Sequence, residues 1–124
     1  MDEQKREGFN FEKLLVYQKA LDYVDFVYEL TDKFPKSEIF GMTSQFNRAA
    51  CSIPLNIGEG SGGTTAEFKN FIRISFRSLN ECVVCSTIAK RRKYITEKQN
   101  DKSRKQLLEI TRMLSGLRNS LGNK

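Results

Sequence analysis

One predicted helix carries polar side chains at a spacing that could support chemistry. The line of polar groups falls within residues 46–60, and its members are Arg48, Ser52, Asn56 and Glu59. An apolar face runs beside it at helical spacing, formed by Phe46, Ala49, Ala50, Ile53 and Ile57. Glu59 and Glu81 are the carboxylates expected near the core, and either could pair with Arg48. Two carboxylates could act as acid and base, but the pattern favours a buried ionic network that fixes the register of the helices.

Two cysteines form a C-x-x-C motif, Cys82 and Cys85, inside a predicted helix. A zinc site needs four ligands, and the sequence has three cysteines and no histidine. A redox motif needs an exposed helix N-terminus that lowers the thiol pKa, and this pair lies well past one. The lack of histidine also removes the commonest general base near neutral pH. We therefore predict buried structural thiols, no metal site and no enzymatic activity.

A glycine-rich stretch, Gly58-Glu59-Gly60-Ser61-Gly62-Gly63, matches the letters of a dinucleotide-binding loop. Such a loop follows a strand and belongs to a βαβ unit, whereas a helix precedes this one. Glu59 would also repel a pyrophosphate. The stretch is therefore interpreted as a flexible turn between two helices, and no cofactor is expected.

Basic residues gather in the second half of the chain. Residues 1–62 carry 7 Lys/Arg and 10 Asp/Glu, a net charge of −3, whereas residues 63–124 carry 14 and 5, a net charge of +9. Two sets stand out, one spaced by four residues and one ending the same predicted helix: Lys69, Arg73 and Arg77, then Lys90, Arg91, Arg92 and Lys93. The helix dipole would explain the second set but not the first. A solvated basic helix face is the alternative for the charge asymmetry as a whole. The sets favour phosphate-driven binding of RNA or DNA.

Four helical segments account for the apolar pattern, at about residues 12–34, 43–59, 65–93 and 97–121. The second helix is predicted to continue through Pro54, because the apolar spacing continues across that residue. Capping boxes begin the last two, Thr64 with Glu67 and Thr96 with Gln99. Short connections force neighbouring helices to be antiparallel. The sequence therefore predicts one all-α domain over residues 1–124, an up-and-down antiparallel four-helix bundle.

The first predicted helix carries two apolar stripes side by side. One stripe is formed by Leu14, Tyr17, Leu21, Val24 and Tyr28, and the other by Val16, Ala20, Tyr23, Val27 and Leu30. This face is broader than the seam of a two-stranded coiled coil. One flank is expected to pack in the bundle and the other against a second subunit.

The composition is that of a soluble globular protein. At 124 residues the chain can bury a core without disulfides or metals. No apolar run is long enough to cross a bilayer, and the N-terminus lacks the apolar core of a signal peptide. An odd number of cysteines within helical patterns suits a reducing compartment. A cytoplasmic location without membrane association is expected.

Short motifs along most of the chain carry a family resemblance. They are Phe11-Glu12-Lys13-Leu14, Val16-Tyr17-Gln18-Lys19-Ala20, Phe34-Pro35 with Glu38, Ser44-Gln45, Arg48-Ala49-Ala50, Ser52-Ile53-Pro54, Asn56-Ile57-Gly58-Glu59-Gly60, Ser78-Leu79 and Glu81. They resemble the four-helix-bundle proteins encoded within intervening sequences of bacterial large-subunit (23S) ribosomal RNA genes.

The resemblance implies a left-handed up-and-down bundle that assembles into a ring, a homopentamer. It also implies that six residues occupy the family's characteristic polar positions: Arg48, Ser52, Asn56, Glu59, Ser78 and Glu81. Related bundles include basic, pentameric accessory proteins of retroelements, which associate with nucleic acid and a reverse transcriptase. This likeness is at the level of the fold and does not by itself carry function.

Three functional hypotheses follow. The leading one is a non-enzymatic oligomeric bundle whose basic surface, built mainly from the third and fourth predicted helices, binds RNA or DNA backbone without strong sequence specificity. The alternative is a protein-interaction scaffold or accessory subunit whose basic face meets an acidic partner protein. The third is an enzyme or small-ligand binder that uses Arg48, Asn56, Glu59 and Glu81.

Overall fold

The computed structural model describes residues 8–122 and contains four long helices. These are α1 (Leu15–Thr31), α2 (Met42–Ser61), α3 (Thr65–Arg91) and α4 (Glu97–Ser120), and two short 3-10 turns accompany them, η2 (Asn10–Lys13) and η3 (Lys36–Glu38). The described residues form no strand, so the all-α prediction is confirmed. Every helix within this range is too short or too polar to cross a lipid bilayer.

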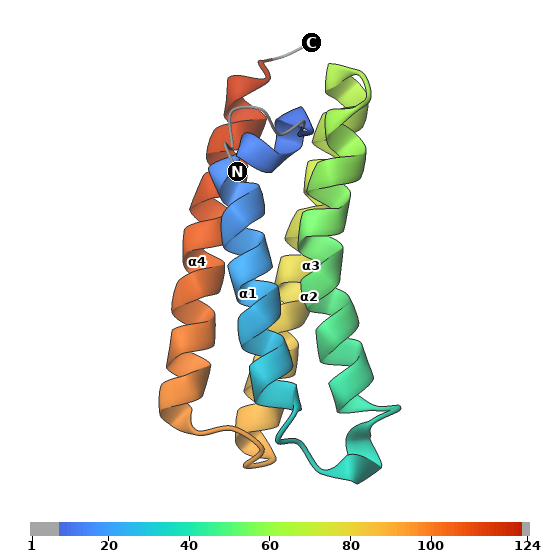
Figure 1. Ribbon diagram of the computed structural model, residues 1–124. Helices are drawn as coiled ribbons and strands as arrows, with labels where there is room; N and C mark the ends of the chain where they lie inside the picture. The colour runs from blue at the N-terminus through green and yellow to red at the C-terminus, as the bar shows by residue number, and fades with distance from the viewer. Residues whose placement is uncertain (1–7, 123–124) are drawn as a thin grey trace, which may run out of the picture.

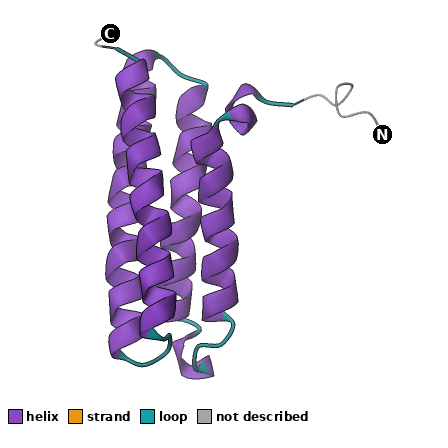
Figure 2. Cartoon of the chain, turned by 90° about the vertical axis from the view of Figure 1, so that its left-hand side faces the viewer, coloured by secondary structure: helices purple, strands orange, loops and turns teal. Residues whose placement is uncertain are grey.

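The helices run alternately up and down, so α4 ends where α1 begins (Figure 1). Each helix packs against its neighbours in the chain, and α1 also packs against α4. Within residues 8–122, α1 and α3 do not approach each other closely, and neither do α2 and α4, so these pairs are diagonal. A view from the side shows the same elongated bundle (Figure 2). The predicted up-and-down antiparallel four-helix bundle is therefore confirmed.

The first helix is shorter than predicted. It begins at Leu15 because Leu14 has extended backbone angles (φ −70°, ψ 126°), and the residues before it form η2. It ends at Thr31, and the chain turns before Pro35 with the Phe34 N–H donating to the Thr31 carbonyl at 3.0 Å. A proline disfavours helical angles at the residue before it, which agrees with this early end.

The end of α3 also differs from the prediction, because Lys93 adopts a left-handed backbone conformation (φ 65°). The Tyr94 N–H donates to the Ala89 carbonyl and the Lys93 N–H to the Lys90 carbonyl, both at 2.9 Å. This is the Schellman arrangement, which usually has glycine at the left-handed position. The helix therefore stops at Arg91, two residues before its predicted end.

Both predicted capping boxes form. The Thr64 hydroxyl accepts from the Glu67 N–H at 3.1 Å, and the Glu67 carboxylate accepts from the Thr64 N–H at 2.8 Å. Thr96 and Gln99 make the same two bonds at the start of α4. The proline in α2 does not end that helix, which continues through Pro54 to Ser61 as the apolar spacing predicted.

The core lies along the axis of the bundle. The predicted apolar face of α2 is buried at every position: Phe46, Ala49, Ala50, Ile53 and Ile57. On α1 only the second stripe is buried in full, Val16, Ala20, Tyr23, Val27 and Leu30, whereas the first remains partly exposed. On α3, Ser78 and Cys85 are buried, whereas Phe68 and Val83 are only half-buried.

Buried hydrogen bonds link the helices across this core. The Tyr23 and Ser103 hydroxyls lie 2.8 Å apart and join α1 to α4. The Ser75 hydroxyl donates to the Ile53 carbonyl at 3.0 Å, which joins α3 to α2. No buried side-chain nitrogen or oxygen of the described residues lacks a partner. Buried polar groups of this kind favour a single register of packing.

One carboxylate, Glu38, couples the α1–α2 connection to the α3–α4 connection, and it gives a pH-dependence that can be tested. Glu38 accepts from the Met42 N–H at 3.0 Å and from the Tyr94 hydroxyl at 2.7 Å. These bonds lower the pKa of Glu38 below its ordinary value of 4.5. Glu38 therefore stabilises the fold above pH 4.5, and this contribution is lost as the pH falls through its lowered folded-state pKa.

We expect Glu38→Gln to have a lower free energy of unfolding than wild type at neutral pH. The difference between the two proteins should narrow as the pH falls below 4.5. Urea unfolding followed by circular dichroism over a pH series measures it. Glu29→Gln is the control, because Glu29 is exposed and accepts no hydrogen bond within residues 8–122. A gap between wild type and Glu38→Gln that stays constant with pH would contradict the assigned role.

Candidate functional site

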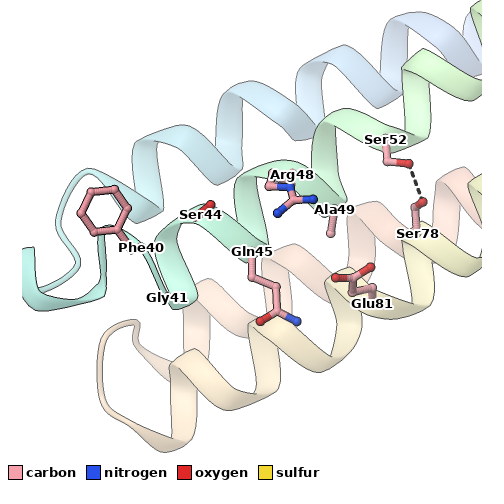
Figure 3. A pocket seen from close by; sticks show the side chains of 9 residues that line it. All are labelled: Phe40, Gly41, Ser44, Gln45, Arg48, Ala49, Ser52, Ser78 and Glu81. Atoms are coloured by element: carbon pink, nitrogen blue, oxygen red, sulfur yellow. Dashed lines mark hydrogen bonds between the residues drawn. The ribbon is translucent and has the colours of Figure 1, made fainter.

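A polar pocket opens between α2 and α3 and contains several of the predicted site residues (Figure 3). Its volume is about 480 Å³, and its lining consists of Phe40, Gly41, Ser44, Gln45, Arg48, Ala49, Ser52, Ser78 and Glu81. The α2 residues recur at helical spacing and face the two α3 residues across the pocket. The lining offers a guanidinium, a carboxylate, an amide and several hydroxyl groups.

Two hydroxyl groups of this pocket, Ser52 and Ser78, are joined by hydrogen bonds to each other and to Asn56, which lies one turn further along α2. The Ser78 hydroxyl donates to Ser52 Oγ at 2.7 Å, which ties α3 to α2. Asn56 Nδ2 donates to the Ser52 carbonyl at 2.7 Å and to Ser52 Oγ at 2.9 Å. Ser78 and Asn56 are buried and Ser52 is half-buried. These bonds hold the two helices in register without any charged group.

The predicted buried ionic network is wrong. Arg48, Glu59 and Glu81 are all exposed, and none of them forms an ion pair within residues 8–122. They lie at the outer edge of the helix contact, where water solvates their charges, and burying a charge would be costly. Arg48 and Glu81 line the polar pocket, but Glu59 faces a different groove, and Asn56 is bonded in the helix interface. The four residues of the enzyme hypothesis therefore do not converge on one site.

The cysteine and glycine motifs have structural explanations. Cys82 and Cys85 are buried, and burial raises the pKa of both thiols, that of Cys85 to about 11. No three metal-ligating side chains gather anywhere in residues 8–122. The glycine-rich stretch ends α2 and forms the turn to α3, with Gly60 buried against α3. The predicted burial of both thiols is confirmed, whereas the glycine stretch is a turn only at Gly62 and Gly63, because Gly58 to Ser61 still belong to α2.

The three basic residues at the start of α3 have different surroundings. Lys69 is half-buried and its amino group donates to the Gly122 carbonyl, at the end of α4. Arg73 is exposed and donates to Asn70 Oδ1 at 3.0 Å, and Arg77 is exposed with no side-chain partner among the described residues. Lys69 thus has a structural role at a helix C-terminus. Arg73 and Arg77 are free to meet a ligand.

The second basic set lies at the opposite end of α3. Lys90 pairs with Glu97 at 3.2 Å, whereas Arg91, Arg92 and Lys93 are exposed. At 1.5 Å per residue, the two sets are separated by about 20 Å along the helix. The predicted basic residues therefore do not form one continuous patch on α3 alone.

Two basic side chains of α4 lie beside α3, one next to the first set and one in the gap between the two sets. Arg118 lies over the Phe76 ring at 5.1 Å from its centroid, and Arg104 lines a groove beside Asn80. Because α3 and α4 are antiparallel neighbours, these residues border the same seam as Arg73. We call this the α3–α4 basic surface, comprising Lys69, Arg73, Arg77, Arg91, Arg104, Arg112 and Arg118. Its continuity depends on the packing of the two helices, which the spacing along α3 does not reveal.

Exposed aliphatic side chains interrupt the α3–α4 basic surface. Val84 is 56% exposed and Leu108 54% exposed. Leu108 also lines a groove of about 240 Å³ between the two helices. The surface is therefore mixed, with cations around a small apolar groove.

An apolar groove lies on the opposite side of the bundle, between α1 and α2. We call it the α1–α2 groove; it has a volume of about 530 Å³ and is lined by Phe11, Tyr17, Leu21, Val24, Cys51, Pro54, Leu55, Gly58 and Glu59. It contains most of the uncovered apolar stripe of α1. The second stripe of α1 packs inside the bundle as predicted, and the contact of the first stripe with a second subunit stays a prediction.

Comparison with known proteins gives a family and a fold. The family model described as 23S rRNA-intervening sequence protein matches residues 12–116. The chain is also similar to a crystal structure of a protein of unknown function from the S23 ribosomal protein family of Bacteroides thetaiotaomicron VPI-5482. The two are 25% identical with a TM-score of 0.77, over 84% of this chain and 98% of the other. No curated protein matches the sequence.

Proposed function

The chain belongs to the 23S rRNA-intervening sequence protein family, and from this premise we propose that it is a non-enzymatic, self-associating bundle that binds RNA or DNA backbone. The α3–α4 basic surface would make the contact. Its exposed arginines can each approach a phosphate oxygen, and arginine matches phosphate geometry well. Because no aromatic stacking platform or recognition helix accompanies them in residues 8–122, binding should be weakly sequence-specific and strongly dependent on salt.

The observation that carries this proposal is the distribution of charge. Residues 63–124 carry a net charge of +9, and the exposed cations of α3 and α4 lie on neighbouring helices.

Self-association is supported by the uncovered stripe on α1. Large exposed apolar surfaces mark interaction sites, and this one extends into the α1–α2 groove. The resemblance to ring-forming relatives suggests a homopentamer. A ring would also repeat the α3–α4 basic surface several times, which raises the effective affinity for a long polyanion.

The test of nucleic-acid binding is fluorescence anisotropy with structured RNA and duplex DNA over a salt series. We expect the double variant Arg73→Gln/Arg77→Gln to bind about tenfold more weakly at low salt. Its plot of log affinity against log salt should be shallower by about 0.9 for each lost duplex phosphate contact. Lys69 is left intact because it also contacts α4.

The matched control is Lys13→Gln/Lys33→Gln, which removes the same charge from exposed positions away from the α3–α4 basic surface. It should bind nearly as tightly as wild type. If wild type fails to bind at low salt, or if the two double variants lose equal affinity, the proposed backbone-binding surface is wrong.

A second candidate is an acidic partner protein, and the exposed aliphatic residues favour it. Val84 and Leu108 beside the arginines suit an acidic amphipathic helix, which would bury its apolar side in the groove between α3 and α4. Leu108→Ser separates the two candidates. It should weaken capture of such a partner after nuclease treatment while leaving the affinity for nucleic acid unchanged.

A further inference from the structure

The α1–α2 groove is an apolar site that no part of residues 8–122 fills. Leu55 on its α2 side is 62% exposed. Phe11 closes one end, where its ring packs edge-on against Tyr17 with 5.1 Å between centroids. The groove has one charged side chain, Glu59, which is exposed and forms no ion pair among the described residues. Its chemistry suits a bulky apolar side chain with a cation nearby.

The same chain presents a side chain of that kind. Phe40 is 95% exposed and lies on the connection just before α2 (Figure 3), and Ile39 beside it is also exposed. The Glu38 bonds to Met42 and Tyr94 hold this connection in place. Lys36 lies within the same connection, is exposed and has no carboxylate partner in residues 8–122. The result is an ordered apolar projection with a positive charge beside it.

We propose that Phe40 of one copy inserts into the α1–α2 groove of a second copy, with Lys36 approaching Glu59. The inference rests on the self-association proposed above and names its contact. Both parts are apolar and otherwise uncovered, and their flanking charges are opposite. An aromatic side chain that fills a neighbouring pocket is the usual form of an energetic hot spot at an interface.

One chain cannot make this contact with itself. Phe40 precedes α2, whereas Leu55 lies in its second half, so at 1.5 Å per residue they are about 20 Å apart. The projection and the groove are thus different surfaces, and the interface is heterologous. Heterologous interfaces build rings when the rotation between copies closes, and open filaments when it does not. The contact therefore provides a route to a closed ring of copies.

The test is the mass of the assembly in solution, measured by analytical ultracentrifugation without nucleic acid. We expect Phe40→Asp and Leu55→Asp each to reduce the wild-type oligomer to monomers, since one removes the projection and the other charges the groove. Leu15→Asp is the matched control, because Leu15 is 61% exposed and lies on the flank of α1 away from the groove. It should keep the wild-type mass. Circular dichroism checks that all three variants remain helical.

Mixing the two monomeric variants tests the heterologous geometry. The Phe40→Asp copy keeps an intact groove and the Leu55→Asp copy keeps an intact Phe40, so an equal mixture should form dimers and nothing larger. If wild type is oligomeric and Phe40→Asp forms an assembly of the same mass, the proposed Phe40 contact is wrong but self-association is still supported. If wild type is monomeric at micromolar concentration, both proposals are overturned. Neither result bears on nucleic-acid binding.

Discussion

Replacing Gly60 by alanine should lower the free energy of unfolding by about 2 kcal/mol, because the added methyl group would collide with α3. A Cβ at Gly60 would lie 2.6 Å from Phe71 Cβ and 3.0 Å from Phe68 Cδ1. Since Phe71 Cβ is attached directly to the backbone, a change of rotamer cannot relieve the first contact. The two helices would have to separate, which loosens the packing along their shared interface. Chemical unfolding followed by circular dichroism gives the change.

Gly116→Ala is the matched control for this variant. Gly116 also lies within a long helix, but a Cβ there would meet no atom within 4 Å. Alanine has the higher helix propensity, so this variant should gain up to about 1 kcal/mol. If the free energy of unfolding falls for Gly60→Ala and rises for Gly116→Ala, the packing effect is separated from the effect of helix propensity. If Gly60→Ala is at least as stable as wild type, the close approach of α2 and α3 at this position is wrong.

Gly60 also illustrates how far the sequence can predict the fold. Apolar spacing identified the four helices, and all five positions predicted for the α2 apolar face are buried, because burial of one face produces that period directly. The capping boxes placed the starts of α3 and α4 because the cap residues are local in sequence. Gly60 itself was interpreted as part of a turn. Its role depends on the distance between two helices, which no local pattern contains.

The polar line on α2 shows why the site was harder to predict. Adjacent faces of a helix differ by small rotations, and the angle at which α3 meets α2 decides which side of the line is buried. That angle buries Asn56 and Ser78 and leaves Glu59 and Glu81 in water. The sequence therefore indicated polar groups beside the core correctly but not which of them would be solvated.

The candidate surfaces needed information from separate parts of the chain. Arg104 and Arg118 join the basic residues of α3 only because α4 returns antiparallel beside it. Phe40 lies in a connection without periodicity, and its exposure depends on how Glu38 orders that segment. An apolar pair, Ile39 and Phe40, in an otherwise polar connection was the one available signal. The surfaces available for partners thus arise from tertiary packing rather than from local motifs.

Replacing Tyr23 by phenylalanine should lower the free energy of unfolding by about 1–3 kcal/mol, because it leaves a buried hydroxyl without a partner. Tyr23 and Ser103 are both fully buried, and their oxygens lie 2.8 Å apart. Ser103→Ala should be destabilising for the same reason, since it strands the tyrosine hydroxyl. The double variant should be more stable than the two single effects predict by addition, because no polar group is then left unpaired. Strict additivity in urea unfolding would contradict the assigned bond.

The dependence of stability on alkaline pH tests the burial of the Tyr23 hydroxyl independently. Burial raises the pKa of Tyr23 well above its ordinary value of 10.0, so the folded state holds this proton more tightly than the unfolded state. The wild-type protein should therefore lose stability as the pH rises past 10, because the unfolded state releases the proton first. Tyr23→Phe has no hydroxyl to ionise, so its stability does not fall for this reason. The difference in unfolding free energy between wild type and Tyr23→Phe should therefore narrow above pH 10. Cys82 and Cys85 are also buried with raised pKa values, and they should leave a residual alkaline sensitivity in the variant.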